Sequence, residues 1–327
     1  MSAEPRRARV KALAKINLGL KVLYRRPDGY HELRTVFQTV SLADVLDLEF
    51  RPGRGRRIEA YPEIPNNLVI QAAEAVFDAA SIHGEFRARI TKRIPMGSGL
   101  GGGSSNAAAV LLALPALAGK PLALERLIDL ASRLGSDVPF FLWGGAAAAC
   151  GRGTELYPLP DAPPLHGVIV APGIHVATPE AYRKLARPGW AEAAGSLTET
   201  PNFNYINKFQ AFVWGAQGQP AARWDLSVFE NDFESVVFDL HPRLKQIKRT
   251  LERLGALCAS MSGSGSALYA LFENRQQAEA VWRGWKAEPA FRVRTVSRAE
   301  YRRLWRRSLA WLVDGKLWPP DGGARKI

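Results

Sequence analysis

A glycine-rich stretch lies between a strand-like and a helix-like segment of this chain. Residues 95–108 read Pro-Met-Gly-Ser-Gly-Leu-Gly-Gly-Gly-Ser-Ser-Asn-Ala-Ala. Residues 86–94 before it alternate as a strand does, and the alanines and leucines from Ser105 onward predict a helix that Pro115 kinks or ends. Glycine accepts positive φ and lets backbone approach a ligand, and residues 104–106, Ser-Ser-Asn, are good N-cap residues. The stretch therefore predicts a loop whose backbone N–H groups converge on a phosphate.

Other glycine-rich motifs fit this stretch less well. Gly97, Gly99 and Gly102 satisfy GxGxxG, but the region about 20 residues further on is helical in pattern rather than the end of a second parallel strand with a ribose-binding acid. A Walker A loop needs a lysine after the glycines, and the VAIK and HRD signatures of protein kinases are absent from the sequence. A flexible loop between packed elements is the remaining alternative, which the direct passage from strand to helix disfavours.

The rest of the chain indicates two closely packed lobes. Residues 8–50 form a strand-rich opening with a turn at Arg26-Pro27-Asp28-Gly29, helices are expected at 67–80, 122–134 and 242–254, and further strands at 166–173 and 266–272. Residues 188–226, rich in Gly, Pro, Trp and Asn, are interpreted as an insertion. We expect an N-terminal lobe over 1–165, a C-terminal lobe over 166–298 and a basic amphipathic extension over 299–327.

Charge and apolar content limit the classes of partner. The net charge of +13 suggests nucleic acid or an anionic membrane, but residues 1–11 and 301–327 supply +3 and +5 of it, so no nucleic-acid partner is expected. Cys150 and Cys258 are too few for a disulfide framework, and residues 107–118, the longest apolar run, are short of the roughly 20 residues of a membrane span. A cytoplasmic protein is the expectation.

Four motifs in order resemble those of a known enzyme family. They are residues 95–109 above, two N-terminal blocks (Ala14-Lys-Ile-Asn-Leu18 and Asp28-Gly-Tyr-His-Glu-Leu33), Gly135-Ser-Asp-Val-Pro-Phe-Phe-Leu142 followed by Gly151-Arg-Gly153, and Met261-Ser-Gly-Ser-Gly-Ser-Ala267. Together they resemble the GHMP superfamily of galactokinase, homoserine kinase, mevalonate kinase and phosphomevalonate kinase. The triple glycine before Ser-Ser-Asn-Ala-Ala is similar to the form typical of its diphosphocytidyl-methylerythritol kinases.

The resemblance implies a fold and a reaction. The implied fold is α+β and two-lobed, with an N-terminal lobe like a ribosomal-protein domain and a ferredoxin-like C-terminal lobe. ATP and substrate would meet between the lobes. The implied reaction transfers the γ-phosphoryl group of ATP to the 2-hydroxyl of a methylerythritol carrying a cytidine diphosphate, in isoprenoid precursor synthesis by the non-mevalonate (MEP) route. Magnesium is expected to arrive with the nucleotide, because no carboxylate cluster in the sequence suggests a dedicated metal site.

The same resemblance implies roles for single residues. Asp137 would be the general base, and Lys15 would polarise the acceptor hydroxyl; by themselves they read as a turn carboxylate and a solubilising residue of an edge strand. The implied substrate-binding residues are Asn17, Tyr30, His31 and Tyr182. The implied ATP-binding residues are Asn67, Pro95, Met96, Gly97, Ser98, Gly99, Leu100, Gly101, Gly102, Gly103, Ser104 and Ser105.

Two alternatives stay open. One keeps the superfamily but takes homoserine, mevalonate or a related alcohol as substrate. The other is a binding protein whose basic ends engage nucleic acid or membrane, since a helix at residues 299–313 would place Tyr301, Leu304, Trp305 and Leu312 on one face with arginines opposite. Such helices more often pack on their own domain. Oligomeric state is left open by the sequence.

Overall fold

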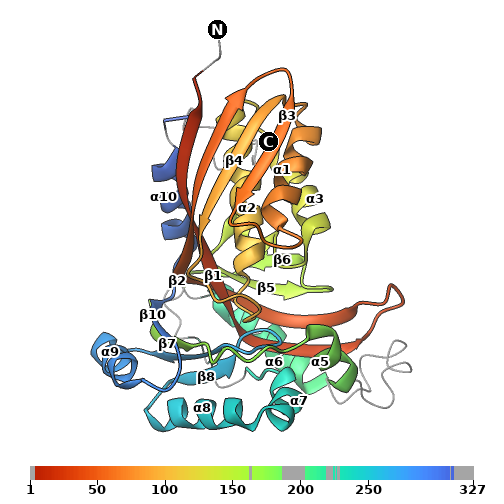
Figure 1. Ribbon diagram of the computed structural model, residues 1–327. Helices are drawn as coiled ribbons and strands as arrows, with labels where there is room; N and C mark the ends of the chain where they lie inside the picture. The colour runs from red at the N-terminus through yellow and green to blue at the C-terminus, as the bar shows by residue number, and fades with distance from the viewer. Residues whose placement is uncertain are drawn as a thin grey trace.

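Two long antiparallel strands open the chain and run through both of its halves. The computed structural model describes residues 4–161, 164–185, 203–218, 224, 226, 229–309 and 311–312 (Figure 1). Strands β1 (Arg6–Arg25) and β2 (His31–Pro52) pair from Arg6↔Phe50 to Arg25↔His31, with three register shifts along the way. The shifts bend this hairpin, so its tip curves away from the sheet in which it starts (Figure 1).

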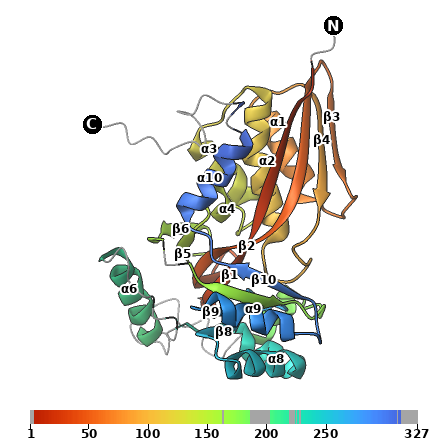
Figure 2. The same cartoon turned by 90° about the vertical axis from the view of Figure 1, so that its left-hand side faces the viewer.

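A six-stranded sheet forms around this hairpin. One end of β2 pairs with β4 (Gly84–Thr91), which pairs in parallel with β3 (Arg56–Tyr61), and the other end pairs with β5 (Ala146–Cys150) and through it with β6 (Glu155–Pro158). Helices α1 (Leu68–Ala79), α2 (Gly102–Ala118) and α3 (Leu124–Leu134) cover one face of the sheet (Figure 2). The short helix α4 (Phe140–Trp143) follows.

Helix α2 differs from its prediction at both ends. Its N-cap is Gly101 in the left-handed conformation, so the helix starts at Gly102, and Ser105 lies inside its first turns rather than at the cap. The helix also continues through Pro115 to Ala118. Every residue from 105 to 117 is buried, and this packing outweighs the hydrogen bond that a proline removes.

The C-terminal lobe is built on a four-stranded antiparallel sheet in the order β10-β7-β9-β8. Its strands are β7 (His166–Val170), β8 (Cys258–Met261), β9 (Leu268–Phe272) and β10 (Ala290–Arg294). The helices of this half are α5 (Thr178–Leu185), α6 (Phe203–Gly218), α7 (Phe233–Leu240), α8 (Pro242–Arg253) and α9 (Arg275–Gly284). Helices and sheets in two lobes confirm the predicted α+β class.

The helix α10 (Arg298–Leu309) returns to the N-terminal lobe (Figure 2). Tyr301, Trp305 and Leu309 are at most 3% exposed and belong to that lobe's core, with Leu304 and Leu312 packed against it. The apolar face predicted for residues 299–313 therefore packs on the protein itself. Residues 310 and 313–327 of the predicted extension lie outside the described residues, as does most of the predicted 188–226 insertion.

Candidate active site

A large cavity is lined by residues of both lobes. It encloses about 1360 Å³. The N-terminal lobe contributes parts of β1 and β2, the glycine-rich loop and the turn before α4, and the C-terminal lobe contributes residues 175–179, 182, 183 and 263–265. Ligand pockets commonly hold about 300–1000 Å³, so this cavity has room for two ligands side by side.

Lys15 and Asp137 face each other in this cavity. Lys15 lies beside a register shift of β1 and its side chain is 4% exposed, whereas Asp137, in the turn between α3 and α4, is 31% exposed. Lys15 Nζ lies 3.3 Å from Asp137 Oδ2 and donates to Asn17 Oδ1 at 2.6 Å. Asn17 Nδ2 in turn donates to Thr35 Oγ1 at 2.8 Å. The ammonium group of Lys15 is thus held between a carboxylate and an amide.

The glycine-rich loop takes a conformation that requires glycine. Gly99 and Gly101 have φ angles of +77° and +72°. A Cβ on Gly99 would lie 2.0 Å from the Ser262 carbonyl oxygen, and one on Gly101 would lie 2.8 Å from the Phe141 ring. The N-cap of α2 makes no side-chain hydrogen bond, so the N–H groups of residues 102–104, which line the cavity, remain available to an anion.

The buried carboxylate of Asp44 fixes the loop at both of its ends. It accepts hydrogen bonds from Arg93 N at 2.7 Å and Ile94 N at 2.9 Å, where the chain enters the loop. It also accepts from Asn106 Nδ2 at 3.0 Å, inside α2, and pairs with Lys92, which lines the cavity. None of the sequence motifs includes Asp44. Its signal is an acidic residue in phase with the apolar side chains of β2, where an unpaired charge would be costly.

Asn67 also lines the cavity, at the start of α1. It is the N-cap of α1, where its Oδ1 accepts a hydrogen bond from Val69 N at 3.0 Å. Its Nδ2 is buried and finds no hydrogen-bond acceptor among the residues that the structure describes. Buried polar groups rarely stay unpaired, so this amide suits an acceptor atom of a bound ligand.

Aromatic rings from the two lobes stack at the other side of the cavity. His31 of β2 and Tyr182 of α5 lie with ring centroids 4.4 Å apart and planes 18° from parallel. Burial, reinforced by the charge of Arg25, lowers the pKa of His31 and favours its neutral form. Burial, with a contribution from Asp137, raises the pKa of Tyr182 to about 12, so its hydroxyl stays protonated. Tyr30, next to this pair, is 48% exposed.

Arg152 covers Tyr30. Its guanidinium carbon lies 3.5 Å from the centroid of the Tyr30 ring, and both residues line the cavity. The turn before it is fixed to β2, because Gly151 N donates to Glu32 Oε1 at 3.2 Å and Leu33 N donates to Gly151 O at 2.8 Å. Arg152 Nε is buried without a hydrogen-bond partner in the described part of the chain. The Gly-Arg-Gly motif of the sequence contains this arginine, but the motif alone indicated no role for it.

The lining of the cavity is cationic. Among the described residues, Asp137 is the one carboxylate that lines it, against Lys15, Arg25, Lys92, Arg152 and Arg183. Such an excess of positive charge attracts polyphosphates. Within the described residues no three His, Cys, Asp or Glu side chains gather as metal ligands. Of the helices that the structure describes, none has the length and apolar character to cross a bilayer.

The predicted site residues, with one exception, line this cavity. They are Lys15, Asn17, Tyr30, His31, Asn67, Pro95, Met96, Gly97, Ser98, Gly99, Leu100, Gly101, Gly102, Gly103, Ser104, Asp137 and Tyr182. Ser105 does not line it: the residue is buried, its hydroxyl donates to Leu13 O at 2.7 Å and its N–H donates to Gly101 O. Ser105 therefore ties α2 to β1 beneath the loop.

Two protein-family descriptions match the chain. Residues 67–145 match the GHMP kinases N terminal domain, and residues 217–290 match the GHMP kinases C terminal family. The first range contains the glycine-rich loop and Asp137, and the second contains the 262–266 turn.

Relatives match over nearly the whole length. The chain is 52% identical over 319 residues to a 4-diphosphocytidyl-2-C-methyl-D-erythritol kinase of Solibacter usitatus, covering 96% of each chain, and 43% identical over 276 residues to one of Chlorobaculum parvum, covering 83% of this chain and 91% of the relative. A crystal structure of 4-(cytidine 5'-diphospho)-2C-methyl-D-erythritol kinase superposes with a TM-score of 0.70 at 39% identity, covering 88% of this chain and 98% of the other. The fold is shared with a homoserine kinase of Cytophaga hutchinsonii, at a TM-score of 0.67 and 19% identity, covering 89% and 95%.

Proposed function

Because the chain belongs to the 4-diphosphocytidyl-2-C-methyl-D-erythritol kinases of the GHMP family, we propose that it transfers the γ-phosphoryl group of ATP to the 2-hydroxyl of 4-diphosphocytidyl-2-C-methyl-D-erythritol. The observation that carries the proposal is the placing of the Lys15–Asp137 pair in one cavity with the glycine-rich loop and the His31–Tyr182 stack. A phosphoryl donor and a base-bearing acceptor fit the two sides of such a cavity.

In the proposed mechanism Asp137 is the general base. Its carboxylate takes the proton of the 2-hydroxyl while that oxygen bonds to the γ-phosphorus and the bond from phosphorus to the β–γ bridging oxygen breaks, releasing ADP. The Lys15 ammonium, 3.3 Å from the carboxylate, stabilises negative charge on the attacking oxygen. Asn17 holds Lys15, and the proposal gives it a hydrogen bond to the polyol as well.

The residues of the loop suit a nucleotide. The N–H groups at the start of α2 supply donors to phosphate oxygens, and glycine at 99 and 101 leaves no side chain between backbone and ligand. The unpaired Asn67 amide would bond the adenine. Magnesium would neutralise the β- and γ-phosphates, and since Asp137 and Ser104 offer few oxygen ligands, it would be held mainly by the nucleotide.

The aromatic side of the cavity supports a cytidine-bearing acceptor over a smaller alcohol. Tyr30, His31 and Tyr182 present flat aromatic faces on which a nucleobase could stack. Homoserine and mevalonate have no ring and would leave these faces without a partner. Arg152 and Arg183 add positive charge for a diphosphate.

A coupled ADP-release assay across alcohols tests the proposal. With ATP and magnesium, we expect turnover with 4-diphosphocytidyl-2-C-methyl-D-erythritol and at least about 10³-fold lower kcat/KM with homoserine or mevalonate, because most of the substrate contacts would be lost. Phosphorus NMR of the product identifies the new monophosphate ester. Equal or higher kcat/KM with homoserine or mevalonate would contradict the proposed acceptor.

A further inference from the structure

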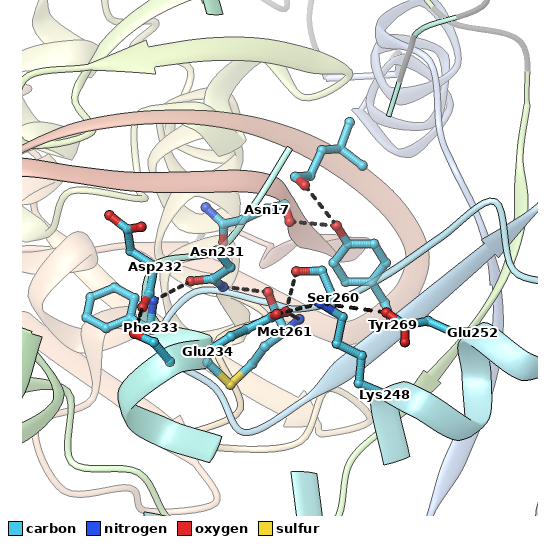
Figure 3. Close-up of polar contacts among 12 residues, drawn as sticks. Asn17, Asn231, Asp232, Phe233, Glu234, Lys248, Glu252, Ser260, Met261 and Tyr269 are labelled. Carbon is cyan, nitrogen blue, oxygen red and sulfur yellow. Dashed lines mark hydrogen bonds and ion pairs between the residues drawn. The ribbon is translucent and has the colours of Figure 1, made fainter. Parts of the chain in front are cut away.

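Residues 231–234, Asn-Asp-Phe-Glu, connect strand β1 to the turn after β8, and Figure 3 shows polar contacts of this segment. The motifs of the sequence do not include these residues. The backbone on either side of Asn231 is fixed to β1: Leu20 N donates to Glu230 O at 2.8 Å, and Asp232 N donates to Leu20 O at 2.9 Å. Leu20 is on the strand that carries Lys15 and Asn17. The segment is thus attached to the strand of the proposed catalytic lysine.

The Asn231 side chain spans from this attachment to the glycine-rich turn after β8. Its Nδ2 donates to Met261 O at 2.7 Å and to Gly263 O at 2.8 Å, and its Oδ1 accepts from Phe233 N at 3.0 Å (Figure 3). The residue is 4% exposed. Both amide hydrogens and the amide oxygen are therefore used, in a site that excludes water.

The turn that Asn231 holds packs against the phosphate loop. Ser262 Oγ donates to Gly99 O at 3.0 Å, and Ala267 N donates to Ser98 O at 3.1 Å. A Cβ on Gly263 would lie 3.4 Å from Gly99 O and 3.6 Å from Lys15 Nζ. The turn lies directly behind the loop and beside the lysine, so a shift of the turn would displace both.

We propose that Asn231 is a positioning residue for phosphoryl transfer: its amide holds the 262–266 turn, and through it the phosphate loop, at a fixed distance from Lys15. The inference rests on the proposed function. It assigns to Asn231 no contact with substrate. Its effect is on the alignment of donor and acceptor, and a misplacement of about 1 Å can cost about 10²-fold in rate.

Asn231→Asp and Asn231→Ala test the proposal. Aspartate keeps the shape but turns an acceptor toward two carbonyl oxygens, whereas alanine leaves the carbonyls unpaired without opposing them. We expect kcat to fall about 10²-fold in Asn231→Asp and about tenfold in Asn231→Ala. In Asn231→Asp the KM for the alcohol should stay within about threefold, since an aspartate oxygen can still accept from Phe233 N and so keep Phe233 against Tyr182. The Kd of ATP should rise about tenfold in Asn231→Asp as the phosphate loop loses its support.

Two control variants separate positioning from stability. Lys248→Met removes the 2.6 Å ion pair between Lys248 and Glu234 (Figure 3). Glu234 belongs to the same network as Asn231, because its Oε1 accepts from Met261 N at 2.8 Å. Lys248→Met should lower Tm and leave kcat and the Kd of ATP unchanged. Asn274→Asp makes the same substitution at the N-cap of α9, where aspartate caps equally well, and should change neither activity nor Tm.

The activities and ATP affinities of these variants decide whether Asn231 positions the phosphate loop or only stabilises the fold. If kcat and the Kd of ATP in Asn231→Asp stay within about threefold of the parent, the proposal is overturned. It is also overturned if Lys248→Met loses as much kcat as Asn231→Asp. Should Asn231→Asp fail to fold, Asn231→Ala carries the same test. A parent chain inactive on the diphosphocytidyl alcohol would count against the proposed function alone, because the Kd of ATP still tests Asn231.

Discussion

At the scale of single residues, a substitution in the Lys15–Asp137 pair should lower the rate of phosphoryl transfer without lowering the affinity for ATP. Asp137→Asn keeps the shape of the side chain but cannot take a proton, so kcat should fall by about 10²–10⁴-fold, the usual contribution of a general base. The Kd of ATP, measured by nucleotide titration, should be unchanged. The matched control is Asp129→Asn on α3, where the carboxylate pairs with the surface arginines Arg126 and Arg133. Near-normal turnover of Asp137→Asn would remove this carboxylate from the role of base.

Arg152 is expected to contribute to acceptor affinity. Arg152→Met keeps much of the side-chain volume and removes the cation that covers Tyr30, an interaction worth about 0.5–2 kcal/mol. The KM for the diphosphocytidyl alcohol should rise roughly 2–30-fold with little change in kcat, in steady-state assays at saturating ATP. Arg126→Met on the surface of α3 should leave both constants as they are. A fall in kcat with an unchanged KM would argue against this role.

The burial of His31 determines how the free energy of unfolding changes with pH. Its folded pKa lies below the ordinary 6.5 because burial and Arg25 disfavour the imidazolium, so the folded chain binds fewer protons than the unfolded chain. The free energy of unfolding contributed by His31 is therefore intact above pH 6.5 and is lost as pH falls through 6.5 to the lower folded pKa.

Urea unfolding of the parent and of His31→Gln at pH 7.5 and pH 5 measures this contribution. The stability advantage of the parent should shrink at the lower pH. The same substitution at exposed His83 serves as the control. An advantage that stays constant or grows on acidification would contradict the assignment.

At the scale of elements, the phosphate loop depends on a glycine at position 99. In Gly99→Ala the added methyl group would meet the Ser262 carbonyl oxygen at 2.0 Å, on a backbone whose φ of +77° already disfavours alanine. The loop must move away from the 262–266 turn, so the Kd of ATP should rise at least about tenfold, as measured by calorimetry. Gly284→Ala at the end of α9, where the methyl group would meet nothing within 4 Å, should bind ATP as the parent does.

Helix α10 is expected to be a large contributor to stability. Trp305 is 3% exposed within the core of the N-terminal lobe, and Trp305→Ala should lower the free energy of unfolding by about 3–5 kcal/mol in denaturant titrations. Arg303 is on the solvent face of the same helix, and Arg303→Ala should change stability by less than about 0.5 kcal/mol. Equal effects of the two substitutions would show that the apolar face is not what holds the helix.

The elements that the sequence predicts well are those with a local cause. The alternation of residues 8–50 marks β1 and β2, and Asn67 before an apolar periodic run marks the start of α1. The start of α2 was missed because its N-cap is Gly101, which carries no capping side chain, whereas the polar residues that usually cap a helix lie further on, inside it. Its passage through Pro115 depends on burial, which no local pattern reports.

At the scale of the whole molecule, the cavity combines segments from most of the chain. Its lining runs from Lys15 to Gly265, and β1 and β2 supply parts of both its proposed catalytic and its aromatic side. Motifs predicted the glycine-rich loop, the Lys15–Asp137 pair and the aromatic residues of this lining, because a family resemblance links positions that are distant in sequence. Arg152, Asp44 and Asn231 were missed because their importance lies in a ring, a loop and a turn that only the folded chain brings to them.

The return of α10 to the N-terminal lobe has a consequence for biosynthesis. A ribosome releases the chain from its N-terminus, so β1 to β6 and α1 to α4 emerge well before Tyr301, Trp305 and Leu309. At about 5–20 residues per second, the first lobe waits on the order of 10 s with part of its apolar core uncovered while the second lobe is made. A chain truncated before residue 298 would leave that apolar surface exposed to solvent, where chaperones and proteases would recognise it.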